Sequence, residues 1–309
     1  MKAKLQVESC QLLVSRRKQA ARKTFNLQPS TCNLERAFTL IELLVVISIM
    51  GLLAALAVPA LKNLGKSNIQ VSAARQLLDD VGRARQLAIS QHTTVYMVFV
   101  KTNFWMAPGF PNPWWTRPLT FAQKTAATNL CDKQLTGYTF VSLRSVGDQP
   151  GQGTPRYLAS WQNLPDGTFI AQQKFPPLGT PPPYSPPFYI TAYNPTIPIF
   201  VFHLTNSIPF PTADSKPSPI IYLPYIAFNY LGQLTVDGQN LAGLDEYIPL
   251  AQGTVSPAMN PAKKTYDISA SSSPSISETP PGNSTNSMYN IVHIDRLTGR
   301  ATLEYQRVQ

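Results

Sequence analysis

The sequence predicts an α+β protein in which one long N-terminal helix, membrane-spanning in its first half, packs on an antiparallel, β-rich globular domain with long Pro- and Ser-rich loops. Three observations support this prediction. An uncharged apolar run covers residues 43–61, an amphipathic stretch follows it to about residue 92, and short β-branched or aromatic runs separated by turn residues fill the remainder. The 309 residues are 43% hydrophobic, so the chain can bury a core, and its 29 prolines favour turns and long connections.

The apolar run has the length of a helix that crosses a bilayer, about nineteen residues. It follows a basic leader, residues 1–37, which has eight Lys or Arg against two acidic residues and therefore holds +6 of the net charge of +10. Because basic residues stay on the cytoplasmic side of a membrane, the N-terminus is predicted to be cytoplasmic and the C-terminal domain exported. A cleaved secretory signal, with its cleavage site among the small residues 54–60, is one alternative. A buried helix of a soluble protein is another, but it leaves the basic leader unexplained.

The three cysteines are divided between the leader and the rest of the chain. Cys10 and Cys32 lie in the leader, and Cys131 lies beyond it. Removal of the leader would leave no internal disulfide, and a lone Cys131 is more typical of a small buried side chain than of a reactive thiol.

Beyond the apolar run, apolar residues recur at helical spacing. They are Leu77, Leu78, Val81, Ala84, Leu87 and Ala88. One helix is therefore predicted from Phe38 to about His92, with the second half lying against the globular domain. Pro59, helped by Gly51, is predicted to bend or loosen its first half.

After His92 the pattern changes to that of strands. The predicted strands cover residues 93–100, 138–146, 167–173, 196–204, 225–238 and 288–306. The first is expected to be apolar on both faces. The last two are expected to be hairpins that turn near Leu231 and Gly232 and near Thr298 and Gly299. Residues 175–187 and 268–287 are predicted to be loops or disordered excursions.

The junction between the leader and the apolar run reads RAFTLIE, residues 36–42. With the leader and the apolar run, it resembles the processing and assembly motif of type IV prepilins and type II secretion pseudopilins. In that class a small residue, usually glycine, precedes Phe, Thr, Leu, Ile and Glu; here Ala37 stands where glycine is usual. The resemblance is tight over residues 36–62. It implies cleavage by a prepilin peptidase after Ala37 and N-methylation of Phe38, and it places Pro59 at the family's helix-loosening proline.

Glu42 is a carboxylate at the front of the apolar run. An ionised carboxylate near a bilayer core costs a few kcal/mol unless it finds a partner, which makes such residues candidates for function. The resemblance implies the partner: the glutamate neutralises the terminal amine of a neighbouring subunit during filament assembly. The alternative is a side chain near the interface that reaches water.

The expected organisation is a cleaved basic leader (1–37), a transmembrane and assembly helix (38–62), its amphipathic continuation (63–92) and an exported β-rich domain (93–309). The stretches after the helix, among them AFNYLGQL (227–234) and IVHIDRLTGRA (291–301), are similar to H-type minor pseudopilins. EYIPLAQGTV (246–255) and IDRLTGRA also resemble a prepilin-type family called Verru_Chthon cassette protein D.

Catalytic and metal sites find little support in the sequence. His92, His203 and His293 are scattered, and His293 is expected to be a strand residue. Four oxygen-bearing residues could surround a Ca²⁺ ion, but their spacing departs from known calcium loops, and a solvated hairpin is favoured. They are Asp237, Asn240, Asp245 and Glu246. No cofactor is expected, and the protein is predicted not to be an enzyme.

The segment 103–121 gathers six aromatic residues around prolines: Phe104, Trp105, Phe110, Trp114, Trp115 and Phe121. They are expected to cover the sheet as a satellite core; an exposed platform for partners or sugars, as in a membrane-anchored surface adhesin, is the alternative.

A DNA-binding minor pilin for DNA uptake is a further alternative. H-type DNA-uptake pilins have a basic Gly-Arg-x-Arg turn near the C-terminus, whereas this chain has Gly299, Arg300, Ala301 and Thr302. Phosphate contacts would then come from basic side chains near that turn, namely Arg296, Arg300 and Arg307. With only +4 outside the leader, nucleic acid is not expected as a partner.

The resemblance as a whole implies a minor subunit of a type IV pilus or a type II secretion pseudopilus. Its expected partners are the prepilin peptidase, other pilin or pseudopilin subunits, and an assembly platform of the inner membrane. Its expected location is the inner membrane, as a single-pass protein with a cytoplasmic N-terminus and a periplasmic domain, and then the filament.

Overall fold

The computed structural model describes residues 39–107, 120–149, 153–177, 188–190, 197–211, 220–269, 272–284 and 290–304. It divides the chain into two units, one ending at Ala55 and the other beginning at Leu56. The helix α1, Leu40–Gln91, begins in the first unit and ends in the second. No helix in the described ranges is both long and apolar enough to cross a membrane. The membrane span over residues 38–62 therefore stays a prediction.

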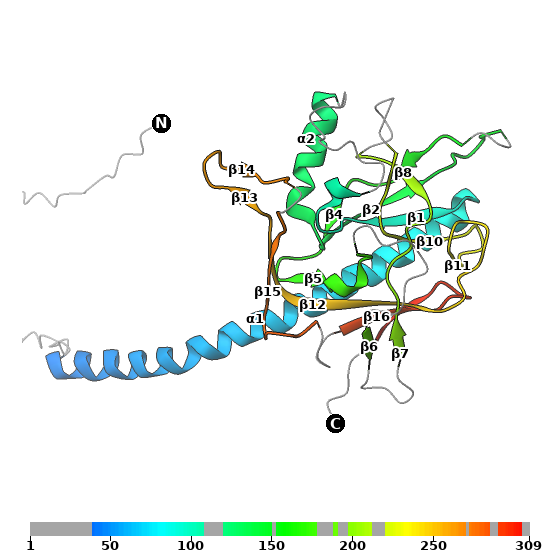
Figure 1. Ribbon diagram of the computed structural model, residues 1–309. Coiled ribbons are helices and arrows are strands. Elements are labelled where there is room, and N and C mark those ends of the chain that lie inside the picture. Colours follow the sequence, from blue (N-terminus) through cyan, green and yellow to red (C-terminus); the bar gives the residue numbers. More distant parts are fainter. Residues whose placement is uncertain are drawn as a thin grey trace, which may run out of the picture. The chain divides into compact units, whose positions relative to one another are not determined.

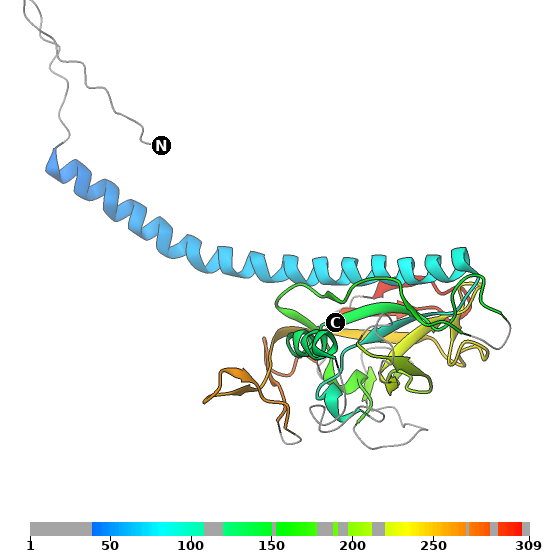
Figure 2. The ribbon, with the colours of Figure 1, turned by 90° about the horizontal axis from the view of Figure 1, so that it is seen from above.

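The second part of α1 packs against the domain along one stripe (Figure 2). Leu77, Val81, Ala84 and Ala88 are spaced four, three and four residues apart and are fully buried. This spacing brings them to one helical face, and small alanines let the helix approach the strands beneath closely. The helix ends at Gln91, and the next residue, His92, has a left-handed φ of 48° that stops further helical turns.

The first sheet has the strand order β11-β10-β1-β2-β3. Its members are β1 (Val95–Phe99), β2 (Gly137–Ser142), β3 (Arg156–Tyr157), β10 (Tyr225–Phe228) and β11 (Leu234–Thr235), and β4 (Gln162–Asn163) also pairs with β2. All pairs are antiparallel. The central strand β1 is buried at every position, because Val95, Met97 and Phe99 face the core under α1 while Tyr96 and Val98 face a second core.

The second core fills the other face of this sheet. It is covered by η1 (Phe104–Met106), α2 (Phe121–Asn129), η2 (Cys131–Lys133) and the ribbon of β8 (Ser207–Pro209) and β9 (Ile220–Tyr222). Helix α2 starts with a full capping box, in which Thr120 accepts from the Gln123 N–H and the Gln123 side chain accepts from the Thr120 N–H. The first sheet is therefore the middle layer of the domain.

A second antiparallel sheet has the order β15-β12-β16-β17, with β5 also pairing with β12 (Figure 1). Its strands are β5 (Thr168–Ile170), β12 (Glu246–Ser256), β15 (Ser275–Glu278), β16 (Asn290–Ile294) and β17 (Ala301–Glu304). Ile248, Leu250, Val292 and Ile294 reach the same core as the buried stripe of α1. Both sheets and the helix thus share one interior.

One short helix and two strand pairs complete the described structure: η3 (Gln172–Lys174), the pair β6 (Phe188–Ile190) and β7 (Ile197–Ile199), and the pair β13 (Met259–Asn260) and β14 (Thr265–Tyr266).

The α+β class, the long helix and the antiparallel domain agree with the sequence prediction, as do both hairpin turns. Several assignments were wrong or missed, among them the following three. β15 lies within residues 268–287, which were predicted to be loop. β12, the longest strand, was not predicted, since its Pro, Gln and Gly interrupt any period-two pattern. Helix α2 was also missed because its polar sequence has no apolar stripe.

Candidate functional site

The start of α1 is built by Thr39 and Glu42. The Thr39 hydroxyl accepts a hydrogen bond from the Glu42 N–H at 3.2 Å, and the Thr39 carbonyl accepts from the Leu43 N–H at 3.1 Å. Thr39 is therefore the N-cap, and Glu42 occupies the third helical position, where a carboxylate also interacts favourably with the helix dipole. The pattern Thr-x-x-Glu is a capping-box signature, which sequence reasoning could have used and did not.

The Glu42 carboxylate accepts no hydrogen bond and forms no ion pair with any residue in the described ranges. Its residue is exposed. Capping therefore uses the backbone of Glu42 and leaves both carboxylate oxygens available to another molecule.

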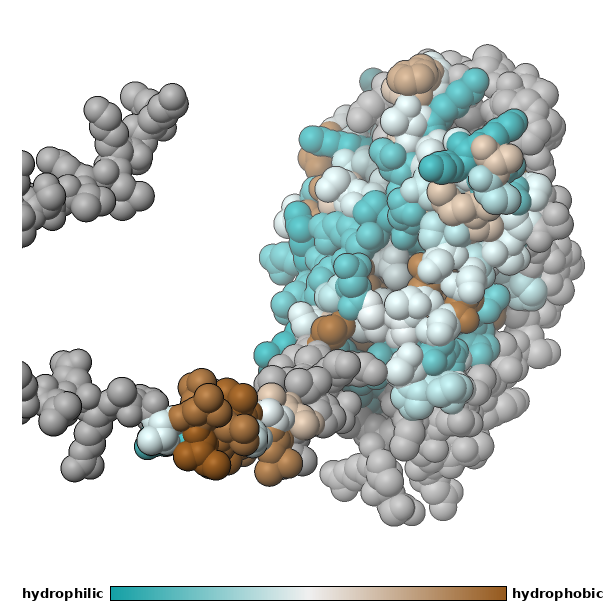
Figure 3. Space-filling view, turned by 90° about the vertical axis from the view of Figure 1, so that its left-hand side faces the viewer, coloured by the Kyte–Doolittle hydropathy of each residue, from teal (hydrophilic) through white to brown (hydrophobic). Residues whose placement is uncertain are grey.

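The rest of this first part of α1 is apolar on all sides. Its exposed large side chains are Leu40, Ile41, Leu43, Leu44, Val45, Val46, Ile47, Ile49, Met50, Leu52 and Leu53, with exposed fractions from 40% to 82%. Figure 3 shows them as a continuous hydrophobic surface. A soluble monomer rarely exposes so much contiguous apolar surface, and such surfaces mark contacts with proteins or lipid. We call residues 40–55 the apolar segment.

Of the residues predicted for processing, Ala37 and Phe38 lie outside the described residues. Gly51 lies in the apolar segment with no atom within 4 Å of the place its Cβ would take. The helix runs through Gly51 and Pro59 without interruption, and their loosening role stays a prediction.

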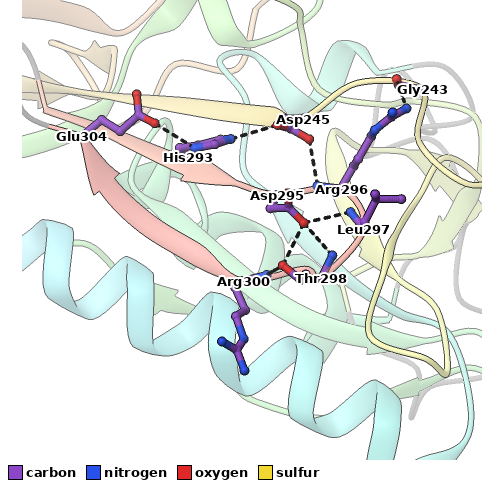
Figure 4. Close-up of polar contacts among 9 residues, drawn as sticks. All are labelled: Gly243, Asp245, His293, Asp295, Arg296, Leu297, Thr298, Arg300 and Glu304. Atoms are coloured by element: carbon purple, nitrogen blue, oxygen red, sulfur yellow. Dashed lines mark hydrogen bonds and ion pairs between the residues drawn. The ribbon is translucent and has the colours of Figure 1, made fainter.

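A second candidate region is the turn between β16 and β17 (Figure 4). Asp295 Oδ1 accepts from the N–H groups of Leu297 and Thr298 and from the Thr298 hydroxyl, at 2.6 to 3.1 Å. These bonds favour the charged form and hold the pKa of Asp295 below its usual value. Gly299 completes the turn with a φ of 62°, and a Cβ there would lie 2.0 Å from the Gly232 carbonyl oxygen. Only glycine fits this crossing of the two predicted hairpins.

The turn is also tied to its neighbours. Arg85 of α1 donates to the Thr298 carbonyl at 2.7 Å, and the Arg296 guanidinium donates to the carbonyl of Gly243. Arg296 is thus engaged within the domain, Arg300 is exposed, and Arg307 lies outside the described residues. The described part of the turn brings no row of free arginines together, so the geometry adds nothing to the nucleic-acid alternative.

His293 lies in strand β16, as predicted. Its Nε2 lies 3.1 Å from Asp245 Oδ2 and its Nδ1 lies 2.8 Å from Glu304 Oε1. Its ring stacks on Tyr247 with centroids 4.6 Å apart. The imidazole therefore links the start of β12 to β17 (Figure 4), a structural contact between strands far apart in sequence.

The four residues considered as calcium ligands make separate contacts and do not converge on one site. Asp237 accepts from the backbone of Gln239 and Asn240 and from the Asn240 side chain. Asp245 contacts His293 and the Arg296 N–H. Glu246 is buried and paired with Lys174. Across the described ranges, no group of three or more His, Cys, Asp or Glu is placed to hold a metal ion.

Sequence reasoning missed the buried ion pair of Lys174 and Glu246. The Lys174 ammonium also donates to the Phe200 carbonyl at 2.6 Å and lies 4.9 Å from the centre of the Phe202 ring. Burial lowers the pKa of Lys174, and the Glu246 charge opposes that change. His203, nearby, has its pKa lowered by burial in the same way. No period in the sequence distinguishes these residues from surface charges.

The predictions for the aromatic segment and the cysteine are partly confirmed. Phe104 and Trp105 are buried in the second core, whereas Phe121 is exposed; Phe110, Trp114 and Trp115 lie outside the described residues. Cys131 is buried, as expected, and burial raises the pKa of its thiol to about 12. Such a thiol is unreactive near neutral pH.

Comparison with known proteins identifies one feature of this chain. Residues 32–58 match the family described as the prokaryotic N-terminal methylation motif. The match covers Ala37, Phe38, Thr39 and Glu42 together. No curated protein and no solved structure matches the chain.

Proposed function

We propose that this chain is a minor subunit of the type IV pilin and pseudopilin class, which the methylation motif at residues 32–58 supports, and that it is assembled into a pilus or pseudopilus through the first part of α1. One observation carries the proposal. The methylation motif leads into a helix whose first turn presents a carboxylate without a partner in the described chain, at the front of an exposed apolar segment.

Processing would create a positive charge that complements the Glu42 carboxylate. Cleavage after Ala37 by the prepilin peptidase would free the amine of Phe38, which the motif marks for N-methylation. Methylation leaves the amine basic, so the terminus keeps a positive charge at neutral pH. The new terminus would lie one residue before the Thr39 cap and four before Glu42. Each subunit would then offer one cation and one anion at the same end of its helix.

The pairing of these charges between subunits would set the register of assembly. Inside a bundle of apolar helices, an unpaired carboxylate costs several kcal/mol, and an amine from a neighbouring subunit removes most of that cost. A wrongly registered subunit would leave both charges buried and unpaired. The pair would thus discriminate between registers while the apolar segment supplies most of the contact area.

The same apolar segment would hold the subunit in the inner membrane before assembly, with the leader in the cytoplasm and the domain in the periplasm. There an assembly platform would extract it into the filament. The domain would contribute contacts with partners rather than catalysis. Its charged groups at Lys174, Glu246 and His293 support this, since each is engaged in a contact within the domain.

The test separates the charge of Glu42 from its place in the helix cap. Glu42→Gln keeps a residue suited to a capping box and removes the charge, whereas Thr39→Ala removes the cap and keeps the charge. We expect Glu42→Gln to be cleaved and methylated normally, as judged by mass spectrometry of the mature N-terminus, and to be lost from sheared filaments. Thr39→Ala should retain incorporation.

Two results would contradict the proposal. Retention of residues 1–37 in the mature wild-type protein would remove the class of processing on which it depends. Normal incorporation of Glu42→Gln would show that the carboxylate charge has no part in assembly.

A further inference from the structure

A pocket of about 450 Å³ lies between the end of β1, η3 and the chain that follows η3. Its lining includes Lys101, Asn103, Gln173, Phe175, Pro176 and Ser273. The volume lies within the range of sites for small ligands, roughly 300 to 1,000 Å³. None of the residues predicted from sequence for processing or assembly lines it.

Lys101 is an unusual residue in the lining of such a pocket. It is 2% exposed, and its ammonium has no hydrogen bond or ion pair with any residue that the structure describes. Burial alone lowers the pKa of Lys101, to about 8, so the side chain still has its positive charge at neutral pH. Burying a lysine without a partner is costly, and proteins seldom retain one without a ligand or a role.

The backbone on either side of Lys101 is held by hydrogen bonds. On one side, the Val100 N–H donates to the Gly137 carbonyl and the Val100 carbonyl accepts from Leu135. On the other, the Asn103 N–H donates to the Gln134 side chain at 2.9 Å. The main chain that positions Lys101 at the pocket is therefore anchored.

Two acceptors of the same lining are also unpaired. Asn103 Oδ1 and Gln173 Oε1 are buried and receive no hydrogen bond from a described residue. The orientation of Gln173 follows from its neighbours: Ser284 donates its proton to the Glu278 carboxylate, so its oxygen must accept from Gln173 Nε2. The amide oxygen of Gln173 is then unpaired, but like Asn103 Oδ1 it is buried and has no surface open to the pocket. Asn103 similarly donates from Nδ2 to Ser273 Oγ at 3.1 Å.

The pocket thus lacks an anion beside Lys101 and has apolar surface from Phe175 and Pro176. We propose that it binds a carboxylate that has an apolar group next to it, as at the free carboxyl end of a peptide. Lys101 pairs with the carboxylate, and an apolar side chain of the ligand packs on Phe175. The proposal does not depend on the assembly role of α1.

The test compares two probes with the full-length protein in detergent. They are N-acetyl-alanyl-phenylalanine as the free acid and the same dipeptide as its carboxamide. By isothermal titration calorimetry at pH 7, we expect the free acid to bind at least tenfold more tightly than the amide. N-acetyl-phenylalanine, which keeps only one residue, distinguishes the two sources of such an acid, a peptide chain end and a small molecule. Weaker binding than the dipeptide indicates a chain end, and equal binding indicates a small molecule.

Lys101→Met should abolish the preference for the acid while the protein stays folded, and Lys124→Met, which removes the same charge from an exposed position on α2, should leave it unchanged. Equal binding of acid and amide, an unchanged preference in Lys101→Met, or no binding of either probe at millimolar concentration would overturn the proposal; the last result means that water alone fills the pocket.

Discussion

Two carboxylates, Glu42 and Glu246, occupy opposite environments in this protein. Glu42 is exposed at the front of an exposed apolar segment, and its carboxylate has no partner in the described ranges. Glu246 begins the central strand of the second sheet, is 8% exposed, and is paired with Lys174. At Glu246 the domain buries a charge and pairs it within the chain. In the apolar segment the described residues leave both the Glu42 carboxylate and the apolar side chains uncovered, which indicates contact with other molecules.

The largest effect should come from breaking the pair inside the domain. Lys174→Met leaves Glu246 buried without its cation, which we expect to lower the free energy of unfolding by about 3 to 5 kcal/mol. Urea unfolding followed by tryptophan fluorescence measures the change. Glu42→Gln, the matched change at the exposed carboxylate, should shift the domain's unfolding by less than about 0.5 kcal/mol.

A comparable loss of unfolding free energy in Glu42→Gln would contradict this difference between the two carboxylates, because it would mean that Glu42 also has a partner inside the folded chain. Adding Glu246→Gln to Lys174→Met should restore part of the stability, since it removes the unpaired charge.

The next effect concerns apolar side chains on the two parts of α1. Leu77→Ala removes a fully buried side chain and should cost about 3 kcal/mol, with a fall in Tm that differential scanning calorimetry measures. Leu44→Ala, at a position 50% exposed, should leave the Tm of the domain unchanged. Equal Tm losses for the two variants would show that the apolar segment also packs within the chain.

A smaller effect of opposite sign is expected at the other buried lysine. The pKa of Lys101 falls from 10.5 to about 8, and at 1.36 kcal/mol for each pH unit this corresponds to roughly 3 kcal/mol as an upper bound. Lys101→Met should therefore stabilise the protein by about 1 to 3 kcal/mol at pH 7, whereas the same substitution at Lys174 destabilises it.

The pH dependence of that gain has a definite sign. Because the folded-state pKa of Lys101 is lowered, the unfolded chain binds more protons between pH 8 and 10.5, and the wild type gains stability as pH rises through this window. The advantage of Lys101→Met should thus be complete below about pH 8 and diminish toward pH 10.5. Urea unfolding at pH 7 and pH 9.5 measures it; an advantage that grows with pH would contradict this origin.

The smallest effect is expected at the cap of α1. Thr39→Ala removes the acceptor for the Glu42 N–H and should cost about 1 kcal/mol, confined to the first turn of the helix. Faster amide hydrogen exchange at residues 40–43, without a change in the domain's Tm, is the expected result. Thr39→Ser, which retains the hydroxyl, should exchange at the wild-type rate.

Local patterns accounted for the elements that sequence predicted correctly. The stripe of Leu77, Val81 and Ala84 has helical spacing, the buried run of β1 is β-branched and aromatic, and Gly232 and Gly299 mark turns by their freedom at positive φ. The motif around Ala37, Phe38 and Glu42 is equally local, because a peptidase recognises adjacent residues of the chain. These features need no knowledge of what lies across the fold.

Other features depended on partners distant in sequence. β12 is a strand because β5, β15 and β16 pair with it along its length. Whether a lysine is buried, and whether a carboxylate meets it, depends on residues about 70 positions away, as for Lys174 and Glu246. By itself the sequence determined the helix, its apolar front and the processing motif, since each is a pattern of neighbouring residues. Only the tertiary structure decided which charges are paired, which lysine remains without a partner, and where a pocket opens, because burial and pairing arise from contacts that no short stretch of sequence contains.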